Sequence, residues 1–175
     1  MSSRVGYKYL RSYQTSTIIY DLTIEFCNWL ISKRSRTHDQ MVQAARSGKQ
    51  NIAEGYLEKS LKMYIKLSGV ARGSLGELLE DYEDYARQNK IPVWSYEKCR
   101  DMREIREIRE KSTSDKPYIP HLPDNPESAV NLLITLCNQA NFLLDRQISA
   151  LEEKFIKEGG YSEKLLRKRL DERRR

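Results

Sequence analysis

Few residues in this chain have the types and spacing that catalysis requires. The two histidines, His38 and His121, lie far apart, and the three cysteines, Cys27, Cys99 and Cys137, match no zinc or redox motif. The sequence contains no HExxH motif and no glycine-rich phosphate loop following a strand. We therefore expect no enzyme activity, no cofactor and no metal centre.

An acidic run on one predicted helix is the only arrangement that could hold a cation. It consists of Glu77, Glu80, Asp81 and Asp84, whose spacing places them close together on a helix. Runs of like charge are more often solvated surface than binding sites. The solvated face is the favoured interpretation, and a metal-dependent enzyme, which would need tightly bound stoichiometric metal, is ranked last.

Basic residues offer a second chemistry, the neutralisation of phosphates. The formal net charge is +6, and residues 161–175 carry seven basic and three acidic side chains. Lys and Arg bind nucleic acid by displacing counterions from the phosphates. Tyr56 or Tyr64 could add base stacking, although burial is favoured for Tyr64. The candidate nucleic-acid-binding residues are Arg46, Lys49, Lys59, Lys62, Lys66, Arg167, Lys168, Arg169, Arg173, Arg174 and Arg175.

Apolar periodicity predicts the helices that must position these side chains. Steps of three and four residues mark long helices at about 13–33, 37–55, 60–88 and 125–158. Thr37 with Gln40 predicts a capping box, and Asn125 before Pro126 predicts another helix start. Gly55 and the Gly159-Gly160 pair predict helix ends. No strand pattern is visible, so the fold is predicted to be all-α.

Two further segments interrupt or follow the long helices. Residues 96–111 predict a short, peripheral, Arg/Glu-rich helix, and residues 112–126 form a Pro-rich loop. Both lie between the third and fourth long helices. We expect residues 1–158 to form an antiparallel up-and-down four-helix bundle, and residues 159–175 to form a separate basic suffix.

Three glycines inside the 60–88 helix need an explanation. Gly69, Gly73 and Gly76 share a face, and each costs roughly 1 kcal/mol relative to alanine. Sequence drift would explain them, but close approach of another backbone is favoured, from a neighbouring helix or from a second subunit. We predict that these glycines lie in an oligomer interface. Asn51 and Glu54 are predicted to form a hydrogen-bond network that shapes a turn at Gly55.

The motif Asn51-Ile52-Ala53-Glu54-Gly55, followed by Ser74-Leu75 and Glu77-Leu78, carries a family resemblance. It resembles the four-helix-bundle family of ribosomal RNA intervening-sequence proteins, to which the accessory variability determinants of retroelements are similar. The resemblance implies a homo-oligomeric ring, typically a pentamer. The retroelement relatives bind nucleic acid and a reverse transcriptase through a basic surface. The segment starting at Gly160-Tyr161 resembles the suffix of a subgroup of this family.

These observations predict a non-catalytic oligomeric protein that binds nucleic acid, RNA or DNA, through its basic surface and tail. The alternative is a protein-docking scaffold or an accessory subunit, for example for a reverse transcriptase-like partner, without direct nucleic-acid binding. No apolar run approaches the ~20 residues of a membrane span, and the odd, scattered cysteines favour a reducing cytoplasm.

Overall fold

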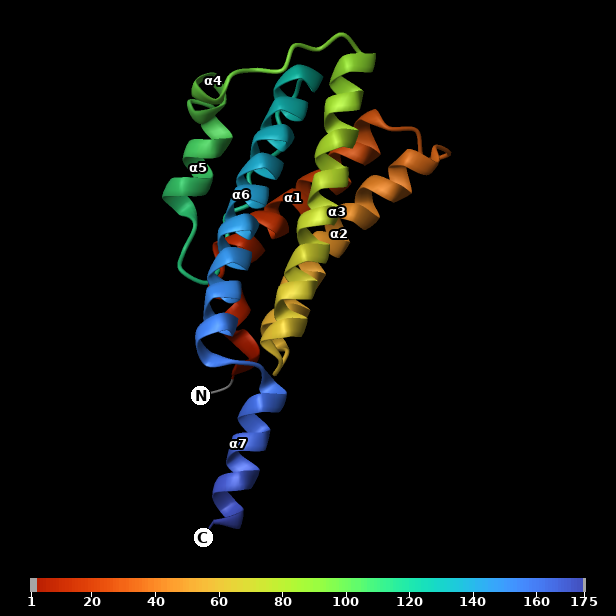
Figure 1. The fold of residues 1–175 in the computed structure, drawn as a ribbon. Coiled ribbons are helices and arrows are strands. Elements are labelled where there is room, and N and C mark those ends of the chain that lie inside the picture. The colour runs from red at the N-terminus through yellow and green to blue at the C-terminus, as the bar shows by residue number, and fades with distance from the viewer. Residues whose placement is uncertain (1–2, 175) are drawn as a thin grey trace.

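Four long helices form the body of the molecule, and each of them packs against two of the others. The computed structural model describes residues 3–174, and for residues 3–5 it describes the backbone only. α1 packs on α2 and α6, while α3 also packs on α2 and α6 (Figure 1). The long helices are α1 (Arg11–Leu30), α2 (Arg36–Leu57), α3 (Leu61–Gln88) and α6 (Pro126–Glu158).

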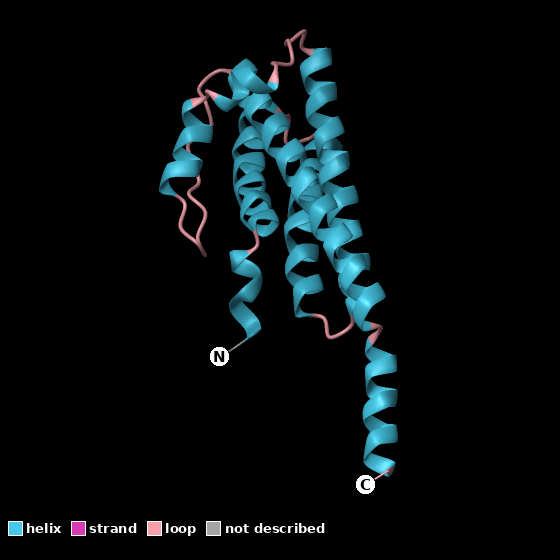
Figure 2. Ribbon diagram, turned by 60° about the vertical axis from the view of Figure 1, so that its left-hand side comes forward, coloured by secondary structure: helices cyan, strands magenta, loops and turns pink. Residues whose placement is uncertain are grey.

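Shorter helices complete the described chain, in which Figure 2 shows only helices and loops. A 3-10 helix, η1, precedes α1, two short helices separate α3 from α6, and a final helix extends beyond the body (Figure 1). They are η1 (Ser3–Tyr9), α4 (Tyr96–Arg100), α5 (Arg103–Lys111) and α7 (Tyr161–Arg173). The all-α prediction is confirmed, and α4, α5 and the loop after them occupy the predicted insertion.

Side-chain caps explain where α2, α3, α4 and α6 begin. Ser60 Oγ accepts a hydrogen bond from the Met63 N–H at 3.5 Å, and Asn125 Oδ1 accepts one from the Ser128 N–H at 2.8 Å. A capped N–H would otherwise lack a partner, and each such cap contributes about 1 kcal/mol. These two helix starts agree with the sequence prediction.

Two predicted helix ends in α2 are wrong. Ser35, not Thr37, caps α2: its Oγ accepts from the Thr37 N–H at 3.2 Å. Gly55 does not stop the helix, since α2 continues to Leu57 and Gly55 has no positive φ. Instead, a Cβ at Gly55 would come within 2.9 Å of the Tyr64 ring and 3.2 Å of Leu67 Cβ. Gly55 therefore allows α2 and α3 to approach closely.

The predicted 96–111 helix is divided in two at Asp101 and Met102. The break lets Cys99 and Met102 turn their side chains into the core, where their exposures are 2% and 9%. Trp94 anchors the start of this insertion: its backbone N–H donates to Asn131 Oδ1 at 2.7 Å, and its indole N–H donates to Glu127 Oε1 at 2.7 Å.

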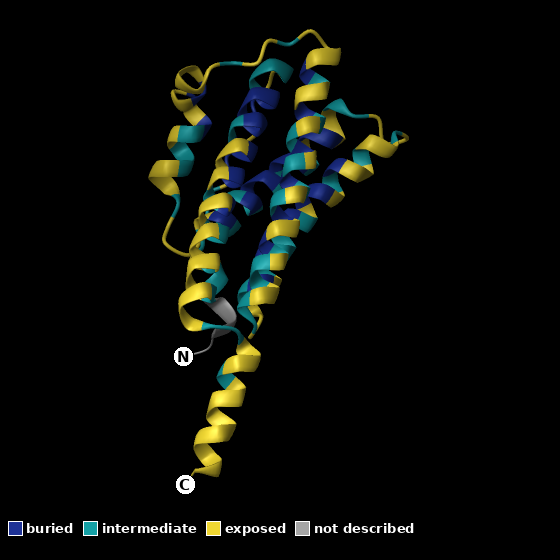
Figure 3. Ribbon diagram, viewed as in Figure 1, coloured by how far each residue is buried: buried dark blue, intermediate teal, exposed yellow. Residues whose placement is uncertain are grey.

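The core lies among the four long helices, shown in dark blue in Figure 3. Phe26, Leu75 and Tyr82 are completely buried, and the Phe26 and Tyr82 rings meet edge to face at 5.1 Å between centroids. The Tyr82 hydroxyl lies 2.7 Å from Thr23 Oγ1, and burial raises the Tyr82 pKa well above its ordinary value. Within the described residues, no helix combines the length and apolar character needed to cross a membrane.

Candidate nucleic-acid interface

Lys59, Lys62 and Lys66 form a short basic row where α2 turns into α3. Lys59 lies in the link between the helices, and the other two follow on α3 at helical spacing. All three are exposed, and none forms an ion pair within the described residues. We call these three residues the α3 lysine row. Unpaired, solvated ammonium groups are suited to contact phosphates.

α7 leaves the body at the same end of the bundle as the α3 lysine row (Figure 1). Gly159 makes the junction with a φ of 75°, and the Gly160 N–H donates to Glu163 Oε2 at 3.0 Å. Lys164 pairs with Glu158 at 2.9 Å. The other basic residues of the tail are exposed, and the ribbon of α7 is mostly yellow in Figure 3. They are Arg167, Lys168, Arg169, Arg173 and Arg174, while Arg175 lies outside the described residues.

The two candidates in the middle of α2 do not belong to this group. Arg46 is exposed, but Lys49 is half-buried on the side of α2 that faces α1, where its Nζ lies 4.9 Å from the centre of the Tyr20 ring. The cation–π contact holds Lys49 against the body. The structure therefore brings together the α3 lysine row and the tail at one end, but leaves Arg46 and Lys49 apart.

Tyr56 and Tyr64 pack in an aromatic cluster instead of forming an open stacking surface. Their ring centroids are 6.1 Å apart, and Tyr7 lies 6.4 Å from Tyr56. Burial, with a smaller effect of Tyr56, raises the Tyr64 pKa to about 12. The Tyr64 hydroxyl accepts a hydrogen bond from Gln147 Nε2 at 3.2 Å, which ties α6 to the start of α3.

Asn51 joins α2 to α3 by a polar chain and does not shape a turn. Its Nδ2 donates to the Ser47 carbonyl at 2.9 Å and to Ser47 Oγ at 3.1 Å. The Ser47 hydroxyl lies 2.9 Å from the Ser74 hydroxyl on α3. Glu54 is exposed, with no hydrogen bond or ion pair among the described residues. The motif therefore serves helix packing, which corrects the helix-end interpretation of Asn51 and Glu54.

The predicted glycine face lies on the outer side of α3, and Gly76 also lines a groove between α3 and α6. A Cβ at Gly69 or Gly73 would meet nothing within 4 Å, and one at Gly76 would meet only the Arg72 guanidinium, at 3.4 Å. No neighbouring helix of the same chain therefore explains Gly69 or Gly73. The groove has a volume of about 440 Å³ near Gly76, and the Arg72–Asp145 ion pair at 2.9 Å bridges it.

Two residues in this groove were missed by sequence reasoning. The Phe142 side chain is 60% exposed, and the Asn141 side chain is buried with its Oδ1 lacking a hydrogen-bond partner. Both line the groove together with Gly76. The sequence did contain a signal for them. Asn141 interrupts the apolar period of α6, and Phe142 follows it on the solvent side.

The acidic run lines a separate groove between α2 and α3, together with Ser47 and Ser74. Burial raises the Asp81 pKa, and the neighbouring charges of Asp84, Glu77 and Glu80 raise it further. A bound cation would lower this pKa instead. Among the described residues, no group of three or more His, Cys, Asp or Glu side chains has the geometry to hold a metal ion.

The fold and the site define a class: an all-helical protein with a basic end and no recognisable reaction centre among its described residues. Residues 8–112 match the model of the 23S rRNA-intervening sequence protein family. The match covers more than half of the chain, so the protein belongs to that family, as the Asn51–Gly55 motif predicted. Searches for similar curated proteins and for similar solved structures found no match.

Proposed function

We propose that this protein is a non-catalytic, cytoplasmic binding protein that self-associates and contacts nucleic acid through its basic end. The main supporting observation is that the unpaired α3 lysine row lies beside the start of α7, an exposed basic helix. Membership of a family named for ribosomal RNA intervening sequences favours RNA over DNA. Self-association would multiply a modest basic patch, because linked sites bind with a raised effective concentration.

The outer side of α3, together with its groove against α6, supports the self-association part of this proposal. The glycines there have open space beside them, and the side chains of Phe142 and Val70 (44%) are exposed. A second copy could pack closely on this surface. The family resemblance implies an antiparallel up-and-down bundle assembled as a ring, typically a pentamer, and we propose that arrangement here.

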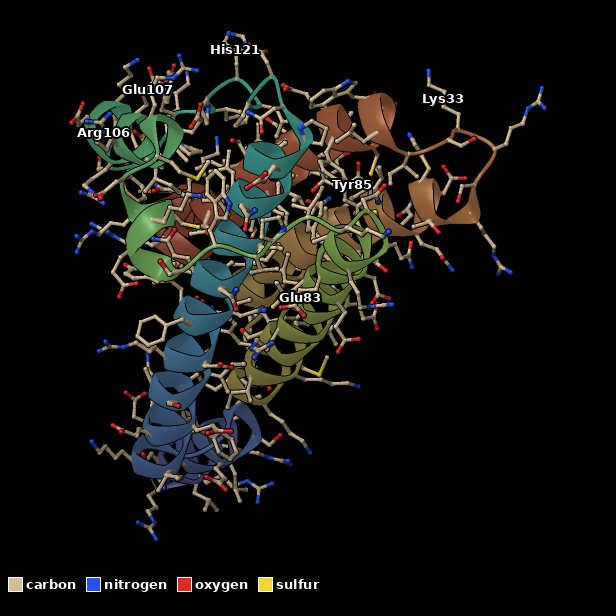
Figure 4. The ribbon with its side chains drawn as sticks, turned by 90° about the horizontal axis from the view of Figure 1, so that it is seen from above. Lys33, Glu83, Tyr85, Arg106, Glu107 and His121 are labelled. Carbon is tan, nitrogen blue, oxygen red and sulfur yellow. The ribbon has the colours of Figure 1, made fainter. Side chains whose placement is uncertain are left out.

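Fluorescence anisotropy of a labelled RNA, measured over a range of salt concentrations, tests the nucleic-acid proposal. Reversing Lys62 and Lys66 to glutamate should weaken binding and reduce the slope of log K against log salt by about 2, because two phosphate contacts are lost. Reversing Lys33 and Arg34, two exposed cations at the α1–α2 turn, is the matched control and should leave the slope unchanged. Figure 4 shows Lys33 projecting from that turn, at one edge of the molecule.

The second candidate function is a protein-docking scaffold or accessory subunit. Leu165, Leu166 and Leu170 on α7 are 48%, 56% and 43% exposed, which is unusual for a helix that serves only as a charged tail. Deleting residues 159–175 separates the two functions. Loss of RNA binding supports the first, whereas loss of a protein partner alone supports the second. Absence of RNA binding by the intact protein at low salt would overturn the first proposal.

A further inference from the structure

A pocket of about 320 Å³ lies between the inserted helix α5 and the body of the molecule. Its walls come from η1, α1, α5, the loop after α5 and α6. The accessible lining is more polar than apolar, and its apolar part comes from the half-buried Ile105, Ile108 and Leu143, while Ile18 and Leu136 are almost completely buried at 2% and 1% exposure. The volume is at the lower end of the range of small-molecule sites, roughly 300–1,000 Å³.

Gln14 closes one side of this pocket. Its Nε2 donates to the Ser114 carbonyl in the loop after α5 and to the Lys8 carbonyl in η1, both at 2.8 Å. The loop is itself folded tightly, since the Thr113 N–H donates to the Lys116 carbonyl at 2.9 Å. Two segments far apart in sequence are thereby fixed around the opening, so the pocket has defined walls.

The charges around the pocket are all of one sign. Arg11 from α1 and Arg109 from α5 line it, and no aspartate or glutamate does so among the described residues. Neither arginine forms an ion pair or hydrogen bond within the described part of the chain. Two other cations of the insertion are paired: Lys111 contacts Glu107 at 2.8 Å, and Arg103 contacts Glu104 at 3.1 Å.

Arg11 also occupies an unfavourable position for a cation. It is the first residue of α1, where the helix dipole is positive, and the first turn contains no acidic residue. The preceding residue, Leu10, provides no side-chain cap. An anion placed between Arg11 and Arg109 would relieve both charges at once. Guanidinium groups bind carboxylates and phosphates with two parallel hydrogen bonds.

We propose that this pocket binds a small organic anion, either a carboxylate or a phosphate monoester, attached to an apolar body about the size of one aromatic ring. The anionic group lies between Arg11 and Arg109, and the ring lies against Ile105, Ile108 and Leu143. The pocket shares no residue with the α3 lysine row or with α7. The inference is therefore independent of the proposed nucleic-acid binding, and either can fail without the other.

Isothermal titration calorimetry with phenyl phosphate and with benzoate tests this proposal on the full-length protein. At least one of the two should bind with one site per chain, and their relative affinities decide between phosphate and carboxylate. Inorganic phosphate lacks the aromatic ring, and benzyl alcohol lacks the anionic group. Each should therefore bind at least tenfold more weakly than the aromatic anions. Saturable binding of neither aromatic anion, or equal binding of benzyl alcohol, would overturn the proposal.

Variants place the bound anion in this pocket and not elsewhere on the basic surface. Arg11→Gln and Arg109→Gln should each weaken binding about tenfold or more, because a charge-assisted hydrogen bond is lost. Arg106→Gln is the matched control, since Arg106 is exposed on the same helix but does not line the pocket (Figure 4). Circular dichroism checks the fold of each variant. An equal loss of binding affinity in Arg106→Gln and Arg109→Gln would refute the site.

Discussion

Glycine has different surroundings on the inner side of α3, where α2 packs against it, and on the outer side of α3. On the inner face, Gly48 of α2 lies against Leu75, and an added Cβ would come within 2.7 Å of the leucine side chain. On the outer face, a Cβ added at Gly69 or Gly73 would meet no other described residue within 4 Å. Glycine within a helix costs stability in both places, but only the inner position is explained by packing within the chain. The difference teaches that packing within the chain accounts for Gly48 and not for the outer glycines, whose place in an interface stays a prediction.

Gly73→Leu should have the largest effect on the outer face, because it should abolish or reduce self-association. A leucine at this open position can be accommodated by the single chain, so helix content should be retained, while a closely packed second copy would be obstructed. Light scattering after size-exclusion chromatography measures the mass. An unchanged mass would remove the outer glycines from the proposed interface.

Gly48→Ala should have the largest effect on the inner face. We expect the free energy of unfolding to fall by about 1–2 kcal/mol, because overpacking exceeds the gain in helix propensity. Chemical denaturation measures this change. In a Leu75→Ala background the same substitution should cost less, since the methyl group then fills part of the space that Leu75 leaves. Equal costs in the two backgrounds would show that Gly48 and Leu75 are not coupled.

Ser68→Ala tests a smaller defect on the inner face. Ser68 is fully buried and its hydroxyl has no hydrogen-bond partner among the described residues, so its removal should raise the free energy of unfolding by about 1 kcal/mol. Ser16→Ala is the matched control, because Ser16 is equally buried but donates to the Ser12 carbonyl at 2.7 Å. Thermal and chemical denaturation should show the gain only for Ser68→Ala. A similar gain at Ser16 would indicate helix propensity as its source.

Asp81→Asn should have the smallest effect on stability. Asp81 lies on α3 at the edge between its inner and outer faces. Burial and neighbouring acidic groups raise the Asp81 pKa in the folded state, so the folded protein binds this proton more tightly than the unfolded chain. The carboxyl therefore lowers stability above its raised pKa, and this penalty disappears below the ordinary value of 3.8. The asparagine should raise the Tm at pH 7 and not at pH 3. Asp124→Asn, in an exposed loop, should change the Tm at neither pH.

Much of the helical architecture could be predicted from sequence, because apolar periodicity and capping residues are local signals. Ser60 and Asn125 are examples, since each supplies a side-chain acceptor to the backbone just after it. Gly55 was misassigned because glycine serves both helix ends and close helix contacts, and only the position of Tyr64 decides between them. The break before Arg103 depends on the burial of Met102 against distant helices, which local sequence does not encode.

The candidate site was predictable to a similar extent. Helical spacing alone groups Lys62 with Lys66. The separation of Lys49 from them depends on where Tyr20 of α1 lies, and the pocket around Arg11 and Arg109 depends on how the insertion folds back. These are tertiary relations between segments far apart in the chain. Residue types led to the predicted chemistry, but packing decided which residues share a surface.

The burial of the three cysteines makes the chain well suited to spectroscopy. Cys27 and Cys137 are completely buried, Cys99 is 2% exposed, and all three are free thiols. Burial raises the Cys27 pKa to about 12 and raises that of Cys137 as well, which suppresses the reactive thiolate. A maleimide dye should therefore spare the native thiols of the folded protein. A single cysteine introduced on α7 would then carry the only fluorophore, and would report directly on the motion of that helix relative to the bundle.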